Sequence, residues 1–224
     1  MSPSVLLDED GVVVVDKPAG LESTGRTPDD PGGVQRHLAD RLGRRIWAVH
    51  QLDRDTTGVL VFVRRKSLVA VWQRRLGRRS TRKRYLAVVH GRPRFRERVV
   101  TGALAYDRRA RRWRVAPEGK SARTELRVRA AVDEAALVEA VLRTGRTHQA
   151  RVHLAHEGHP LFGERRYRTP PCAAHPRHAL HAWRLEVGPE PGFRGATFEA
   201  PVPGDLRGLL ARLGLDDGLL PARG

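Results

Sequence analysis

The apolar residues of this chain follow two patterns, short continuous runs and positions spaced three or four residues apart. Continuous runs bounded by turn-forming residues predict strands, at 12–15, 59–63, 85–89, 99–104, 113–115, 124–128, 137–142, 180–187 and 197–200. Helical spacing predicts amphipathic helices at 34–42, 68–76 and 206–213. A further helix is predicted after the turn at Gly145, with Thr147 as its N-cap.

The order of these elements predicts an α+β fold. Strands come in runs with helices between some of them, and the regular strand–helix alternation of a doubly wound sheet is absent. We therefore expect a mixed, largely antiparallel sheet flanked by helices. No long low-complexity linker divides the 224 residues, so a single domain over 1–224 is the simpler interpretation. Three prolines within 169–176 predict an irregular loop.

The strong positive charge of the chain indicates which class of molecule it binds. The chain carries 42 Lys and Arg residues against 25 Asp and Glu residues, a net charge of +17. The excess is concentrated in the runs 74–84 and 108–114, as is typical of strips that contact phosphates. For either run alone, a merely solvated face is the alternative. The two runs together favour a nucleic acid, and the lack of a long basic amphipathic helix disfavours a membrane surface.

Several other classes find no support in the sequence. No stretch approaches the roughly 20 apolar residues that span a bilayer, and the start of the chain lacks signal-peptide features, so we expect a soluble cytoplasmic protein. The single cysteine, Cys172, excludes an intramolecular disulfide. Without a P-loop or a dinucleotide fingerprint, no nucleotide cofactor is expected. The seven histidines between His148 and His181 match no standard zinc spacing, which leaves a metal-dependent nuclease as a weak alternative.

Polar residues are densest in the loop 49–58, directly before the strand 59–63. This loop holds one His, two Asp, one Arg and two Thr residues. Loops supported by a rigid strand commonly carry functional residues. A turn whose Asp and Thr side chains bond to their own backbone explains the spacing equally well.

The segment 144–153 is a second candidate. His148 and Arg151 lie three residues apart, so they are expected on one face of the predicted helix. A helix N-terminus with arginines binds anions, either a phosphate or a carboxylate such as that of Asp53. An ordinary capped helix with surface arginines is the alternative.

Five segments occur in the order of the successive motifs of one protein family. They are VVVVDKPAGL, HQLDRDTTGVLVF, KRYLAVVHG, GRTHQARVHLAHEGHPLFGERRY and LHAWRLEV. Together they resemble the RluA-type pseudouridine synthases, from about residue 12 to residue 201. The resemblance implies the pseudouridine synthase catalytic fold. It also implies an RNA isomerase that detaches the uracil of a chosen uridine, turns it over and rejoins it through C5, using no cofactor, metal or energy source.

The same resemblance implies roles for individual residues. Asp53 is the catalytic residue, either as nucleophile at C1′ or as the base that starts elimination to a glycal, and both routes stay open. Tyr85 stacks on the flipped uracil. Arg151 pairs with Asp53 and keeps it ionised. Leu180 forms an apolar wall of the uracil pocket.

Gln51, Arg54 and His148 complete the candidate substrate contacts. Gln51 stands where the family usually has an arginine, which fills the gap left by the flipped base, so here a hydrogen-bonding group without charge takes that place. The resemblance predicts structured RNA, ribosomal or transfer RNA, as the partner. The first motif begins near residue 12, so no N-terminal accessory RNA-binding domain is expected, and the high charge favours a monomer. A catalytically silent RNA-binding or chaperone protein on the same fold is the alternative.

Overall fold

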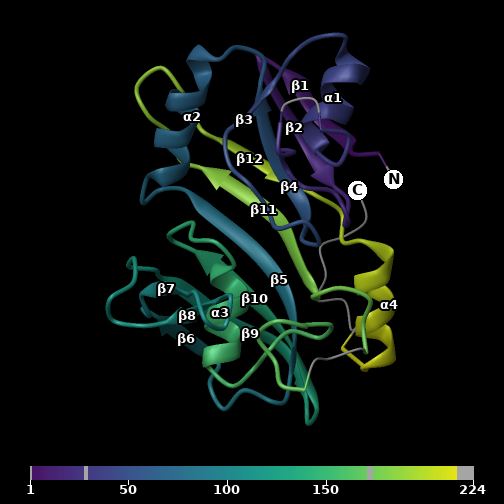
Figure 1. Ribbon diagram of the computed structural model, residues 1–224, viewed down its shortest axis with the longest axis vertical. Coiled ribbons are helices and arrows are strands. Elements are labelled where there is room, and N and C mark those ends of the chain that lie inside the picture. The colour runs from purple at the N-terminus through teal and green to yellow at the C-terminus, as the bar shows by residue number, and fades with distance from the viewer. Residues whose placement is uncertain (1, 28–29, 171–173, 216–224) are drawn as a thin grey trace. The chain divides into compact units, whose positions relative to one another are not determined.

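The computed structural model describes residues 2–27, 30–170 and 174–215, which form two compact units (Figure 1). The first unit comprises residues 1–82 and 182–201, and the second comprises residues 83–181 and 202–224. The single domain expected over 1–224 stays a prediction. None of the helices within the described ranges is long and apolar enough to cross a membrane. Cys172 lies outside the described residues.

The first unit is built around a sheet with the strand order β1-β2-β4-β11, in which β3 also pairs with β4 and β12 with β11. Its elements are β1 (Ser4–Glu9), β2 (Val12–Lys17), α1 (Val34–Leu42), β3 (Trp47–Ala48), β4 (Thr57–Val63), α2 (Ser67–Gly77), most of β11 (Leu180–Val187) and β12 (Ala196–Glu199). The predicted helices 34–42 and 68–76 and the strands 12–15, 59–63, 180–187 and 197–200 are confirmed within one or two residues at most ends.

The core of this unit explains why these segments form. Every residue of β4 is buried, as the continuous apolar run predicts for a central strand. On one face of the sheet, valines of β2 and β4 pack against Trp72 and Leu76 of α2, together with Leu185 and Val187 of β11. The spacing of Trp72 and Leu76 puts both side chains on the buried side of the helix, so the sequence pattern and the packing agree.

Gly58 allows the strands of this unit to approach one another closely. Its φ is +113°, and a Cβ atom there would lie 2.2 Å from the carbonyl oxygen of Ala182. Only glycine meets both requirements, because other residues disfavour positive φ and this backbone oxygen cannot move away independently.

Asp16 of β2 is a half-buried carboxyl group that links stability to pH. Burial raises its pKa to about 6 from 3.8, and the charge of Lys17 and the backbone hydrogen bond from Gly58 offset only part of that effect. Because the folded protein binds this proton more tightly than the unfolded chain does, the contribution of Asp16 to stability decreases as the pH rises through the interval from 3.8 to about 6.

We therefore expect Asp16→Asn to raise the free energy of unfolding by about 1 kcal/mol at pH 8, after allowance for partial exposure, and to have no such effect at pH 4. Urea unfolding of both proteins at the two pH values measures the difference. A variant that is equally stabilised at pH 4 and pH 8 contradicts the stated cause.

The second unit contains a four-stranded sheet in the order β5-β10-β9-β6 and a separate hairpin of β7 and β8. Its elements are β5 (Arg82–His90), β6 (Glu97–Val100), β7 (Leu104–Asp107), β8 (Arg112–Val115), β9 (Thr124–Val132), β10 (Ala135–Leu142), α3 (Gln149–His156) and α4 (Gly204–Arg212). The first residue of β5, Arg82, belongs to the first unit. Helix α3 contacts β8, β9 and β10. The paired strands β5/β10, β10/β9, β9/β6 and β7/β8 are antiparallel.

One predicted strand, 99–104, is wrong. Strand β6, which pairs with β9, ends at Val100, and the chain starts β7 at Leu104, in the separate hairpin. Leu104 packs with Ala122 and Val152, whereas Val99 is 49% exposed. Both ends of the apolar run do form strands, but the two strands belong to different sheets. Local periodicity does not indicate which strands pair.

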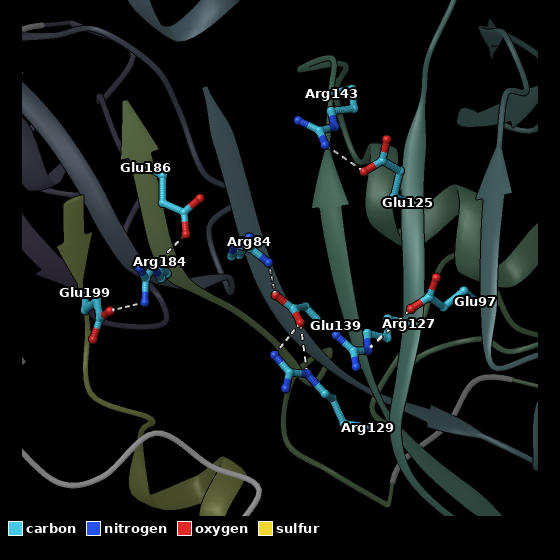
Figure 2. A network of polar contacts seen from close by, with 10 residues as sticks. All are labelled: Arg84, Glu97, Glu125, Arg127, Arg129, Glu139, Arg143, Arg184, Glu186 and Glu199. Carbon is cyan, nitrogen blue, oxygen red and sulfur yellow. Dashed lines mark hydrogen bonds and ion pairs between the residues drawn. The ribbon is translucent and has the colours of Figure 1, made fainter. Parts of the chain in front are cut away.

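Ion pairs cover one face of the four-stranded sheet of this unit (Figure 2). Glu139 of β10 is 2% exposed and binds Arg84 of β5 and Arg129 of β9, with Nη1–Oε1 and Nε–Oε2 distances of 2.8 and 2.9 Å. The sequence run 74–84 is therefore not a uniform phosphate-binding strip. Arg84 stabilises the sheet through its ion pair with Glu139. In the first unit, Arg75 and Arg78 both bind Glu190, so their charges are also paired within the protein.

Candidate active site

Asp53 lies in the loop between β3 and β4 of the first unit, half-buried. At the start of the loop, hydrogen bonds to β4 hold it against the sheet. The Val49 N–H donates to the Val61 carbonyl, and the Val61 N–H donates to Nε2 of His50. Within the loop, the Thr56 N–H donates to the Asp53 carbonyl at 3.0 Å and closes a turn. The loop therefore presents Asp53 from a rigid base.

The residues on both sides of Asp53 are anchored through their backbone. Ser23 Oγ donates to the Leu52 carbonyl and accepts the Leu52 N–H, at 3.0 and 2.8 Å. The Arg54 carbonyl accepts Lys17 Nζ at 2.7 Å and the Gly20 N–H at 3.1 Å. These bonds fix the backbone on both sides of Asp53. They do not use the Asp53 carboxylate, so they position the residue without changing the reactivity of its side chain.

Gln51 and Arg54 are exposed residues of this loop. Gln51 Nε2 donates to Thr24 Oγ1 at 3.1 Å, and Arg54 Nε donates to the Gly20 carbonyl at 2.9 Å. Both side chains thus bind the segment that follows β2. An open cavity of about 560 Å³ lies here, lined by Gly20, Glu22, Thr24, Gly25, Arg26, Asp30, Gly32 and Arg54. Its charged lining suits a polar ligand better than an apolar one.

The other candidates belong to the second unit. Tyr85 of β5 is buried and lies opposite Ala140 of β10. Leu180, the first residue of β11, is also buried, and its carbonyl accepts Arg177 Nη1 at 3.1 Å. The pairing of Arg151 with Asp53, which joins residues of different units, stays a prediction.

Arg151 of α3 lies in a cluster that the sequence did not reveal. Glu164 binds it through two hydrogen bonds of 2.9 Å, and its guanidinium lies 5.2 Å from the ring centre of Tyr167. The Tyr167 hydroxyl in turn lies 2.6 Å from Nδ1 of His148. Four side chains that are spread over 148–167 in sequence are therefore neighbours in this unit.

The prediction of Thr147 as helix N-cap is wrong, and so is the placement of His148 on the helix. Helix α3 begins at Gln149, and His148 precedes it with left-handed backbone at φ 56°. The turn is organised by the Gln149 carboxamide, which accepts the Arg146 N–H at 3.1 Å and the Thr144 hydroxyl at 2.7 Å. A side chain inside the helix thus replaces the expected cap.

Two of the histidines that suggested a metal have structural partners. The fully buried imidazole of His153 bonds to Thr124 Oγ1 and to the Gly102 carbonyl, both at 2.9 Å. His159 Nδ1 lies 3.0 Å from the His90 carbonyl. Among the residues that the structure describes, no group of three or more His, Cys, Asp or Glu side chains is placed to hold a metal ion.

Lys17, Glu164 and Tyr167 are the residues that sequence reasoning missed. Lys17 and Glu164 are charged, yet 0% and 1% exposed. The signal for Lys17 was its position at the end of a buried strand, where a long cation reaches the carbonyls of the following turns. Glu164 and Tyr167 stand at the end of the fourth motif, which was interpreted only through His148 and Arg151.

Solved structures identify the fold class. Human RNA Pseudouridylate Synthase Domain Containing 4 is 25% identical, with a TM-score of 0.77 over 94% of this chain and 93% of its own. Human RNA Pseudouridylate Synthase Domain Containing 1 is 24% identical, with a TM-score of 0.71 over 92% and 86%. The predicted α+β fold with a mixed, mostly antiparallel sheet and flanking helices is confirmed, and it is the pseudouridylate synthase fold.

The sequence comparisons agree with this class. The chain belongs to the RNA pseudouridylate synthase family, whose model matches residues 11–156. Dual-specificity RNA pseudouridine synthase RluA from Escherichia coli K12 is 35% identical over 213 residues, 88% of this chain and 92% of the relative. Ribosomal large subunit pseudouridine synthase D from Nitrosomonas europaea is 36% identical over 220 residues, 92% of this chain but only 64% of the relative. The resemblance to RluA-type enzymes is confirmed.

Proposed function

We propose that this protein isomerises uridine to pseudouridine in structured RNA, with Asp53 as its catalytic carboxylate. The observation that carries the proposal is the backbone anchoring of Leu52 and Arg54 on both sides of Asp53. A nucleophile or base works only when it is held at its target, and a loop that needed only to connect two strands would not require these bonds.

The other candidates take the roles that the resemblance implies. Tyr85 stacks on the flipped uracil, Leu180 lines the uracil pocket and Arg151 orients Asp53. Arg54 and His148 contact the substrate, and Gln51, held by Thr24, takes the place of the usual arginine.

The substrate class follows the names of the relatives. One relative is named for the large ribosomal subunit and another for dual specificity towards RNA. Ribosomal RNA is therefore one proposed substrate, and transfer RNA is the other that the motif resemblance implies. We further propose a cytoplasmic monomer that uses no cofactor.

The direct test incubates the protein with ribosomal and transfer RNA transcripts and maps pseudouridine by carbodiimide treatment and primer extension. A stop at one or a few uridines is expected. RNA that is bound but never converted, in every transcript, contradicts the proposal and supports the binding-only alternative.

The β7–β8 hairpin is the proposed phosphate-binding part of the chain. Its turn carries Arg108, Arg109 and Arg111, all exposed, and within the described residues none of them has an ionic partner. Asp107 Oδ1 accepts the Ala110 N–H at 2.8 Å and shapes the turn. Residues 108–111 of the sequence run 108–114 thus form a structured basic tip, whereas Arg114 of the same run binds Glu118 and Asp107.

Removing the three tip charges, as Arg108→Gln, Arg109→Gln and Arg111→Asn, is expected to weaken RNA binding about tenfold or more at moderate salt, because each arginine displaces counterions from phosphate. The slope of log affinity against log salt is expected to fall by about 2. Filter binding over a salt series measures both.

The matched control replaces Arg41, Arg44 and Arg45 with Gln, which removes the same charge from exposed positions at the end of α1. Equal losses in the two triple variants would mean that net charge, and not the hairpin, sets the affinity.

A further inference from the structure

Tyr106 exposes an aromatic ring on the β7–β8 hairpin, directly before its basic tip. The residue is 48% exposed, and the other large hydrophobic residues exposed in the described ranges, Leu6 and Val99, are aliphatic. Single aliphatic residues are common on protein surfaces. An exposed tyrosine ring, in contrast, offers a flat face that stacks on a nucleobase while its hydroxyl stays in water.

Trp113 supports this ring from the opposite strand. Tyr106 and Trp113 are direct partners in the antiparallel hairpin. Their ring centres lie 5.5 Å apart with the planes at 63°, which is the edge-to-face arrangement that aromatic pairs prefer. Cross-strand aromatic pairs stabilise the strands that carry them. The hairpin itself therefore sets the position of the Tyr106 ring before any partner binds.

The base of the hairpin is packed into the core of the second unit. Leu104 and Val115 are the next pair on the same face of the two strands, because side chains alternate between the faces. Leu104 is 1% exposed, and both Trp113 and Val115 pack against the core cluster that contains it. One face of the hairpin thus runs from buried residues at its base to the exposed Tyr106 near its tip. A binding group on such a support loses little conformational freedom when it binds.

Positive charge follows the ring directly. Arg108, Arg109 and Arg111 lie in the turn that joins the two strands, and all three are exposed. Proteins that bind single-stranded nucleic acid combine the same two elements, cations along the phosphates and aromatic rings for the bases. A protein partner would need a larger contiguous apolar surface than one ring supplies. The combination at the tip therefore favours a nucleic acid.

The occupant of the ring has to be an unpaired base. Within an RNA duplex, the neighbouring base pairs cover both faces of each base, and proteins that recognise single bases bind those that loops, bulges or ends leave unstacked. Stacking on Tyr106 requires such an open face. A continuous duplex can still bind the tip arginines through its phosphates, but it gains nothing from the ring.

We propose that Tyr106 stacks on an unpaired base of the RNA while the tip arginines bind the adjoining phosphates. The inference rests on the proposed function and deepens it, because it specifies a loop, a bulge or a strand end as the part of the RNA at the hairpin. The contact is separate from the proposed stacking of Tyr85 on the flipped uracil. Tyr85 lies in β5 and is 8% exposed, whereas Tyr106 belongs to a different sheet.

The test compares two RNAs of equal length and composition, a stem with an open loop and a continuous duplex, by filter binding. Tyr106→Ala is expected to weaken binding of the stem–loop about tenfold, through the loss of one stacked base, and to change the Kd of the duplex less than about twofold. Tyr106→Phe keeps the stacking face and is expected to bind both RNAs like the wild type. Equal Kd values of Tyr106→Ala and wild type for the stem–loop would overturn the inference.

A salt series separates stacking from a change in the hairpin. Stacking releases no counterions, so the slope of log affinity against log salt is expected to be the same in Tyr106→Ala and the wild type. If the ring only shaped the hairpin, its removal would displace the tip arginines and lower the slope, as their replacement is expected to do. A lowered slope therefore contradicts the stacking role.

Val99→Ala is the matched control. Val99 is 49% exposed on β6 of the same unit and lies outside the hairpin, so its Kd for both RNAs is expected to equal that of the wild type. Urea unfolding of both variants shows that the comparison is made between folded proteins. If Tyr106→Ala does not fold, Tyr106→Leu decides, because leucine keeps an apolar contact with Trp113 and has no stacking face. It is expected to show the same selective loss, and wild-type affinity for the stem–loop rules the stacking out.

Failure of the proposed function gives a different result. Binding is measured without conversion, so a wild type that forms no pseudouridine in any transcript contradicts the function and leaves the stacking test intact. An unaltered Kd in the Tyr106 variants of a converting enzyme contradicts only the stacking, and then leaves the ring to a partner of another class, such as a protein.

Discussion

Asp53→Asn is expected to abolish pseudouridine formation, with a loss of at least about 10⁴-fold in single-turnover rate, while RNA binding changes less than about twofold. A carboxamide has nearly the same shape as a carboxylate, but it is neither an effective nucleophile at C1′ nor a base. The bonds that anchor the loop run through the backbone of Leu52 and Arg54, so they persist in the variant.

The measurement is carbodiimide mapping of pseudouridine with filter binding on the same RNA. Asp40→Asn is the matched control, since Asp40 is an exposed carboxylate on α1 that binds only Arg36 among the described residues. Its activity is expected to equal that of the wild type. Conversion that survives in Asp53→Asn would remove Asp53 from the mechanism under either of the two open routes.

Lys17→Met is expected to lower the free energy of unfolding by about 4 kcal/mol, the largest stability effect among the variants considered. Lys17 Nζ donates to the carbonyls of Pro18, Leu21 and Arg54 at 2.8, 2.6 and 2.7 Å, and the side chain is completely buried. Methionine fills the space but donates nothing, so buried carbonyl groups lose their partner.

The same change is expected to reduce the rate of conversion, because the Arg54 carbonyl directly follows Asp53 and loses one of its two anchors. Urea unfolding measures the stability, and single-turnover assays well below the melting temperature measure the rate. Lys66→Met, at an exposed position directly before α2, is the control and is expected to change the free energy of unfolding by less than about 0.5 kcal/mol. A loss below about 1 kcal/mol for Lys17→Met would mean that water replaces the amine at little cost.

Local patterns predicted most of the helices and strands. The helix 34–42 and the strand 180–187 have the predicted boundaries, because their apolar periodicity coincides with the face that is buried. The strand 99–104 was wrong where two sheets divide one apolar run. Strand β1 was not predicted, since its residues alternate between exposed and half-buried positions without a strong apolar signal.

The candidate site divides in the same way. Asp53 and Arg151 emerge from motifs that the sequence displays, together with their chemistry. The partner of Arg151, by contrast, is thirteen residues further along, in a segment without helical or strand periodicity. The N-cap of α3 was mispredicted because Gln149 bonds back to Thr144 and Arg146, a competition that local propensity does not register.

The order of residues alone therefore determined the family, the α+β class, the basic character and the carboxylate to test. Only the tertiary structure decided which charges are available and which are used internally. In sequence, Arg75, Arg78 and Arg84 resemble the arginines at the tip of the β7–β8 hairpin. In the folded protein, however, Glu190 binds Arg75 and Arg78, and Glu139 binds Arg84. A charge that is removed from water needs a partner of opposite charge close by in space. Such a partner can be far away in the sequence, so the spacing of residues along the chain does not reveal it.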